Sequence, residues 1–186
     1  MTVEEKIYEE VKRRCELPSN AYGIGAWDHH IKIVYELAKK NASEYGANQE
    51  IVSLAALLHD VASVTDVTYT EEHHIIGTKI AEELLLQENY PIEKIEQIKK
   101  CILNHRGSRL ASKNSPEEIC IADSDAMAHF YSIPSLLSMV YREKNLSIDE
   151  GSKFVMEKLE RSYNKMSVKG KKLAKKQYES AKNILK

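Results

Sequence analysis

Glycine and proline are scarce in this chain, with seven and four among 186 residues, and alternation of β-branched residues is nearly absent. Turns collect glycine and proline, and strands show alternating apolar residues, so these shortages argue against a sheet-rich fold. Apolar residues instead recur with the helical period along almost the whole chain. The sequence therefore predicts one all-α domain, a bundle of about seven to nine helices. The predicted helices cover residues 2–15, 27–45, 48–63, 71–88, 92–105, 116–130, 132–143, 147–166 and 168–185, and residues 63–70 are predicted to be a loop.

Cysteine, long apolar runs and net charge are also limited, and each shortage excludes a class of protein. The three cysteines, Cys15, Cys101 and Cys120, form no closely spaced pair, so we expect reduced thiols in a cytoplasmic protein. No apolar run approaches the ~20 residues that span a bilayer, and the N-terminus lacks the pattern of a signal peptide. The net charge of −1 offers no electrostatic basis for binding nucleic acid or membranes.

Histidine and aspartate residues stand on apolar helix faces, where a polar side chain needs a partner. His59 and Asp60 end the most apolar stretch, residues 53–58. A buried polar group without a hydrogen bond or a metal costs roughly 2–7 kcal/mol. A shared metal site is the simplest common partner for these two residues and for five others of the same kind, which are His30, His73, His105, Asp123 and Asp125.

Helical spacing selects among the candidate ligands near the N-terminus. His30 shares a helix face with Val34 and Leu37 and is predicted to point at the core, whereas His29 lies on a mixed, more peripheral face. His59 and Asp60 diverge by about 100° on a helix but can reach one ion between them. An isolated His-Asp pair would favour a structural histidine. With His30 and a later aspartate, the pattern favours a metal.

A second group of candidates follows in the next two helices. His73 lies on a core stripe with Ile76, Gly77, Ile80 and Leu84, and His74 lies on the flank of that stripe. His105 closes another apolar stripe and is followed by Arg106 and Arg109, whose guanidinium groups suit phosphate oxygens. Taken alone, each of these residues is more often structural.

Two aspartates compete for the last ligand position. Asp123 lies on the stripe of Ile119, Ala126, Met127 and Phe130, and Asp125 lies beside Ile121, Ala122 and Ala128. Either could be a buried carboxylate that a metal keeps ionised. His129 follows Asp125 by one helical turn and could orient it, although an ordinary core or surface histidine is the more common reading.

In order, His30, His59-Asp60 and an aspartate near position 125 form a pattern that resembles the HD-domain superfamily of metal-dependent phosphohydrolases. Three segments carry the resemblance: His30-Ile-Lys-Ile-Val34, Leu54-Ala-Ala-Leu-Leu-His-Asp-Val61 and His73-His-Ile-Ile-Gly-Thr-Lys-Ile-Ala81. The likeness covers about residues 27–130, which we expect to form the metal-site core, with C-terminal helices at 131–186.

The resemblance implies that His30, His59, Asp60 and one final aspartate bind a divalent metal, which could be Mn, Fe, Co, Ni, Zn or Mg. Many relatives carry Ala-Asp-x-x-Asp-Ala, and Ala122-Asp-Ser-Asp-Ala126 is one residue shorter. The alignment favours Asp125 and the stripe favours Asp123, and Asp125 is preferred. The resemblance also implies that His73, His74 and His105 hold a second metal or a phosphate. There is no Gly-Tyr-Pro, so degradation of cyclic dinucleotides is not supported.

The leading expectation is a phosphohydrolase acting on a small phosphorylated metabolite, a nucleotide or related phosphoester, through a metal-activated water. Asp60 would be a ligand and accept the proton of that water, while His73, His74 and Arg106 would neutralise phosphate charge. The alternatives are a non-catalytic nucleotide sensor and, less favoured, a di-iron oxygenase. The expected partner is a small phosphorylated molecule. The oligomeric state stays open, with a homo-oligomer as one possibility.

Overall fold

The computed structural model describes residues 1–23, 25–106 and 113–185. Within these residues the chain forms ten α helices, a short π-helical turn and a 3-10 turn, and it has no strand. The all-α prediction is therefore confirmed. The α helices are α1 (Val3–Cys15), α2 (Lys32–Tyr45), α3 (Gln49–Leu58), α4 (Val61–Thr65), α5 (His73–Gln87), α6 (Ile92–Asn104), α7 (Pro116–Tyr131), α8 (Ile133–Arg142), α9 (Ile148–Lys165) and α10 (Val168–Ile184).

Half of these ten helices begin where a short polar side chain can accept hydrogen bonds from the first backbone N–H groups. Thr2 and Ser147 each form a reciprocal capping box with the glutamate three residues later. The side chains of Asn48, Ser115 and Ser167 cap α3, α7 and α10 in the same way. These local signals explain why sequence periodicity placed the helix boundaries within a few residues of those observed.

Two predicted helices are interrupted at the residues that carry the chemistry. The expected helix over 48–63 breaks at Asp60, whose φ of −112° and ψ of 16° leave the α region, so that α3 ends and α4 begins there. The expected helix over 27–45 opens with a π-helical turn, η1 (Trp27–Ile31). Neither break contains proline, and none of the described glycines falls within them, so no sequence signal marked them. The predicted loop at 63–70 instead holds the end of α4 and the 3-10 turn η2 (Val67–Tyr69).

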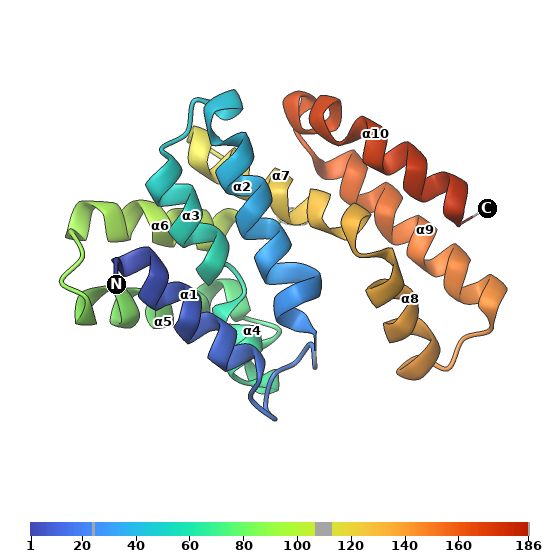
Figure 1. Cartoon of the computed structure of the whole chain (residues 1–186), viewed down its shortest axis with the longest axis horizontal. Helices are drawn as coiled ribbons and strands as arrows, with labels where there is room; N and C mark the ends of the chain where they lie inside the picture. The colour runs from blue at the N-terminus through green and yellow to red at the C-terminus, as the bar shows by residue number, and fades with distance from the viewer. Residues whose placement is uncertain (24, 107–112, 186) are drawn as a thin grey trace.

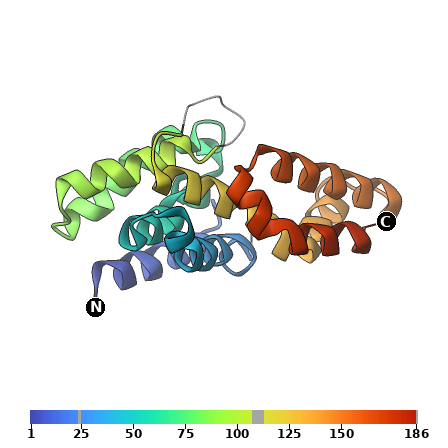
Figure 2. The same cartoon turned by 90° about the horizontal axis from the view of Figure 1, so that it is seen from above.

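The centre of the fold is α3, in which every residue from Ile51 to Leu58 is buried. It packs against α2, α6, α1 and α7, while α5 pairs with α6 and α4 (Figure 1). On the other side of α7, the helices α8, α9 and α10 form a second group, which Figures 1 and 2 show extending away from the first. Because α7 contacts helices of both groups, it is the main element that joins them, and Lys169 of α10 adds a contact with the Glu44 carbonyl of α2. That residues 1–186 fold as one domain stays a prediction.

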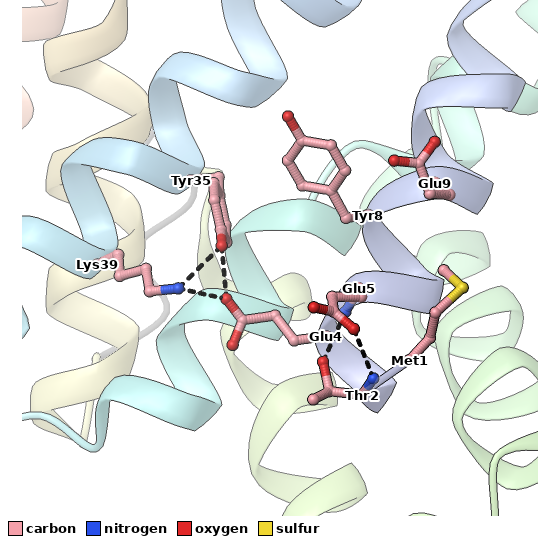
Figure 3. Close-up of a pocket in the computed structure, with 8 residues that line it drawn as sticks. All are labelled: Met1, Thr2, Glu4, Glu5, Tyr8, Glu9, Tyr35 and Lys39. Carbon is pink, nitrogen blue, oxygen red and sulfur yellow. Dashed lines mark hydrogen bonds and ion pairs between the residues drawn. The ribbon is translucent and has the colours of Figure 1, made fainter.

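The N-terminal helix is fastened to α2 by a small polar cluster. The Glu4 carboxylate accepts hydrogen bonds from the Tyr35 hydroxyl at 2.5 Å and from the Lys39 ammonium at 2.7 Å (Figure 3). A hollow of about 620 Å³ lies beside this cluster, lined by Met1, Thr2, Glu4, Glu5, Tyr8, Glu9, Tyr35 and Lys39. None of the predicted metal ligands lines this hollow.

No helix in the described part of the chain combines the length and the apolar character that crossing a bilayer requires.

Candidate metal centre

Five segments that are far apart in the sequence bring histidine and aspartate side chains to one place. The turn η1 supplies His30, and the break between α3 and α4 supplies His59 and Asp60. The start of α5 and the end of α6 supply His73 and His105, and α7 supplies Asp125. His29, the alternative to His30, is exposed.

Asp60 lies between two pairs of histidines and presents one carboxylate oxygen to each pair. Its Oδ2 is 3.5 Å from His30 Nε2 and 3.4 Å from His59 Nε2. Its Oδ1 is 3.5 Å from His73 Nε2 and 3.6 Å from His105 Nε2. Within each pair the two Nε2 atoms are also close, at 3.2 Å and 3.4 Å. The Asp60 carboxylate therefore joins two separate nitrogen pairs.

Three of the four histidines are held in one orientation by their own backbone. In each, Nδ1 lies within hydrogen-bond distance of the carbonyl oxygen three residues earlier, so the ring donates its Nδ1 proton there. The Nε2 atom is then left facing Asp60, and when it is deprotonated it offers the lone pair that a metal-binding histidine needs. The distances are 2.7 Å from His59 to Ala56, 2.7 Å from His73 to Thr70 and 2.6 Å from His105 to Ile102.

The spacing of these atoms fits divalent metal ions. Two ligands about 2.1 Å from a tetrahedral ion lie roughly 3.4 Å apart, which matches the separations within the cluster. Three groups have one ligand atom per residue all within 4.8 Å of one another: His30 with His59 and Asp60, Asp60 with His73 and His105, and His30 with Asp125 and His129. Because the first two groups share Asp60, its two carboxylate oxygens would let the residues of each group hold one ion.

Burial and charge act in opposite directions on Asp60. Only 5% of its surface is exposed. Burial by itself raises the pKa of the carboxyl group, but His59, His105 and His30 outweigh burial and hold the pKa well below its usual range. The same balance lowers the pKa of Asp125, where Lys165 and His129 are the strongest opposing groups. Both carboxylates are therefore ionised at neutral pH, as metal ligands must be.

His59 is expected to make metal loading depend on pH. Burial lowers the pKa of its ring, but the neighbouring Asp60 and Asp125 carboxylates outweigh burial and raise the pKa to about 9. At neutral pH a metal must therefore displace a proton from His59. We expect divalent-metal affinity to rise roughly tenfold per pH unit up to about pH 9 and then to level off. Calorimetric titration with Mn²⁺ in buffers of different ionisation enthalpy measures the proton released, and an affinity that does not change with pH would contradict the expectation.

The structure places the two competing aspartates on different sides of α7, because residues two apart on a helix point about 200° away from each other. Asp125 faces the cluster, with Oδ1 3.5 Å from His30 Nε2 and Oδ2 3.8 Å from Lys165 Nζ. Asp123 instead accepts hydrogen bonds from the backbone N–H of Ser167 at 3.0 Å, from the Ser167 hydroxyl, and from the Tyr45 hydroxyl at 2.9 Å. The structure does not bring Asp123 into the cluster, and it gives this residue a role in fastening α10 to α7.

This contact leaves no room for a side chain at Gly170, in the first turn of α10. A Cβ atom at Gly170 would overlap the Asp123 carboxylate. We expect Gly170→Ala to lower the free energy of unfolding by about 1–3 kcal/mol through overpacking, despite the higher helix propensity of alanine. Urea denaturation measures this loss. The control is Lys172→Ala, which is exposed on the same helix and is expected to leave stability unchanged or slightly higher. Equal stability of Gly170→Ala and the wild type would refute the close contact.

The other predicted site residues lie at the edge of the cluster. His74 is buried next to His73, with 5.7 Å between ring centres, and belongs to none of the three ligand groups. The Arg106 guanidinium donates a hydrogen bond to the Glu71 carbonyl at 3.0 Å and so ties the end of α6 to the segment before α5. Arg109 lies outside the described residues.

Lys165 and Lys158, which act on the cluster, were not among the predicted site residues. His129 was considered, but an ordinary histidine was the favoured interpretation. His129, read from the sequence as an ordinary histidine, has its ring centre 5.4 Å from that of His30. Lys165 reaches Asp125 from α9, and the charge of Lys158 on the same helix also acts on Asp125. Periodicity could not find the lysines, because only the packing of α9 on α7 brings them to the cluster.

A model of the HD domain family matches residues 27–129. The chain belongs to the HD domain family. HD domains form a superfamily of metal-dependent phosphohydrolases that bind divalent metals. The matched residues contain all of the clustered histidines and aspartates, and they end just before α8, so α8, α9 and α10 lie outside the HD match.

Two relatives of this HD-domain chain are similar over parts of their length. Ribonuclease Y of Petrotoga mobilis is 32% identical over 108 residues, which are 58% of this chain and 19% of the relative. An uncharacterized protein of Clostridium beijerinckii is 36% identical over 64 residues, which are 34% of this chain and 41% of the relative. The aligned part thus spans about a fifth of the first relative and two fifths of the second. No solved structure matched the chain.

Proposed function

We propose that this HD-domain protein is a divalent-metal-dependent phosphohydrolase that acts on a small phosphorylated metabolite, a nucleotide or a related phosphoester. The observation that carries the proposal is the Asp60 carboxylate between two Nε2 pairs, with three rings held by backbone hydrogen bonds. A structural histidine cluster has no need for four ring nitrogens directed at one carboxylate. Hydrolysis of phosphoesters is also the chemistry of the family.

The residues divide into two ligand sets in this proposal. His30, His59, Asp125 and Oδ2 of Asp60 would hold one ion, and His73, His105 and Oδ1 of Asp60 the other. Bound divalent metal supplies a water of lowered pKa and positive charge next to the phosphate. Because both Asp60 oxygens face histidine pairs, we assign this residue first to holding the metals. Acceptance of the water's proton by Asp60 stays a prediction.

Elemental analysis of protein purified without chelator tests the proposal, together with a phosphate-release assay on nucleotides and sugar phosphates. We expect close to two divalent ions per chain and turnover that returns when Mn²⁺, Co²⁺ or Mg²⁺ is added back to stripped protein. One ion per chain would reassign His73 and His105 to the phosphate. No metal after reloading would refute the metal centre. Two irons without phosphate release would favour oxygen chemistry instead.

The similarity to a ribonuclease supports a second candidate, cleavage of RNA phosphodiesters. The alignment with this ribonuclease is 108 residues long, slightly longer than the 103 residues of the HD match, which contain the candidate metal ligands. The net charge of −1 argues for a short substrate, because proteins that bind long RNA usually carry a basic surface. Incubation with a short oligoribonucleotide beside nucleoside monophosphates separates the two candidates by whether shortened RNA or free phosphate is released.

A further inference from the structure

The helix α9 lies outside the HD match, yet one of its edges faces the metal centre. Figures 1 and 2 show α9 running beside the end of α7, and the two helices are in contact. The Lys165 ammonium is 3.8 Å from Asp125 Oδ2, while the other oxygen of Asp125 faces His30. An ammonium has three donors, so Lys165 can hold Asp125 and still donate to another oxygen.

Lys158 stands two helical turns before Lys165 and therefore on the same face of α9. Its side chain is partly buried, and within the described residues no carboxylate lies within 4.0 Å of its ammonium. Burial lowers its pKa, and the negative charges of Asp125 and Asp60 act against burial. Its charge also lowers the pKa of His129, next to His30. The helical spacing thus sets Lys158 on the side of α9 from which Lys165 reaches Asp125, and among the described residues its ammonium is in no ion pair that would compete with an incoming anion.

The charges of the centre indicate the kind of anion. Two carboxylates, Asp60 and Asp125, face two divalent ions in the proposed function, so the loaded centre is already positive before the lysines are counted. A phosphate dianion carries more charge than a phosphodiester and has three oxygens that can accept hydrogen bonds from ammonium groups.

We propose that Lys158 and Lys165 form a subsite for the oxygens of a terminal phosphate, so that the substrate is a phosphomonoester. This inference rests on the proposed function, because the subsite lies over the same metal centre. Nucleotides and sugar phosphates with a terminal phosphate both present this group. The C-terminal helices then supply substrate recognition to a metal centre built from the HD match.

Binding of inorganic phosphate tests the subsite without relying on turnover. Calorimetry on Mn²⁺-loaded protein compares the wild type with Lys158→Met and Lys165→Met, and elemental analysis checks that metal is retained. We expect each variant to bind phosphate about tenfold to hundredfold more weakly, as for the loss of one charge-assisted hydrogen bond. The matched control is Lys153→Met, exposed on the same helix, for which we expect unchanged phosphate affinity.

Unchanged phosphate affinity in metal-loaded Lys158→Met would overturn the subsite, as would an equal loss in Lys153→Met. Lys158→Met decides the question if Lys165→Met loses metal through Asp125. Lysine-dependent phosphate binding without hydrolysis of any phosphoester would uphold the subsite and refute the proposed hydrolase. Hydrolysis of p-nitrophenyl phosphate with an unchanged KM in Lys158→Met would uphold the proposed hydrolase and refute the subsite. Faster hydrolysis of bis(p-nitrophenyl) phosphate than of the monoester would overturn the assignment to phosphomonoesters.

Discussion

Replacement of Asp60 by alanine is expected to empty both ligand sets at once. The carboxylate gives one oxygen to His30 and His59 and the other to His73 and His105, so its loss removes a ligand from each set. Because removal of even an outer partner of a metal ligand costs 10–100-fold in affinity, we expect metal affinity to fall by more than about 100-fold. Phosphate release should fall to background while the helical circular dichroism is retained. Elemental analysis after dialysis measures the metal.

A chelator separates this effect from a fold defect. A metal that binds only the folded state stabilises it, so EDTA should lower the melting temperature of the wild type. The same addition should leave the melting temperature of Asp60→Ala unchanged, because there is no metal to remove. Asp149→Ala, an exposed aspartate on α9, is the control and should respond to EDTA as the wild type does. Two metals retained in Asp60→Ala would refute the bridging role.

Asp125→Ala and Asp123→Ala are expected to fail in opposite ways, although they remove the same group two residues apart on α7. Asp125→Ala should lose metal from the set that contains His30, because its Oδ1 faces His30 Nε2. Asp123→Ala should keep its metal but unfold more easily, by about 1–3 kcal/mol, since the Ser167 backbone N–H would lose its acceptor. Elemental analysis and urea denaturation of both variants measure the two effects.

The pair is informative because each variant controls for the other. Loss of metal in Asp123→Ala with metal retained in Asp125→Ala would reverse the assignment of the last ligand. Equal losses in both would mean that α7 shifts as a whole when either side chain is removed. A stable, metal-loaded Asp123→Ala would show that the contact with Ser167 contributes little to the docking of α10.

Sequence periodicity was sufficient where a helix has one buried face. His30 was separated from His29 because Val34 and Leu37 mark the core side of α2. In the structure His29 is exposed, whereas His30 is half-buried with its Nε2 3.2 Å from that of His59. The same argument could not separate Asp123 from Asp125. Every residue of α7 from Cys120 to Ala128 is buried, including both aspartates, so an apolar stripe can be drawn through either. When both sides of a helix are buried, the periodicity of apolar residues no longer shows which side faces the cluster.

The remaining features depend on tertiary contacts that local patterns do not encode. The break at Asp60 could not be predicted, because the helical pattern of apolar residues continues on both sides of it and no glycine or proline marks it. Lys158 and Lys165 read as ordinary solvated lysines of an amphipathic helix until α9 is packed on α7. The candidate metal ligands stand out in the sequence because their residue types are unusual on a core stripe, whereas lysine on a helix edge is common.

The bonds from the histidine rings to the carbonyl three residues earlier also bear on how fast the centre can load. Each of these three rings is held by the backbone carbonyl three residues earlier, so its Nε2 is already in position before an ion arrives. Little rotation of the rings remains to be frozen, which lowers the entropic cost of capture. If the cluster binds a metal as proposed, the slow events of uptake would be the departure of water from the ion and of the proton from His59. Uptake should therefore accelerate with pH and with the water-exchange rate of the ion, Mn²⁺ entering faster than Ni²⁺.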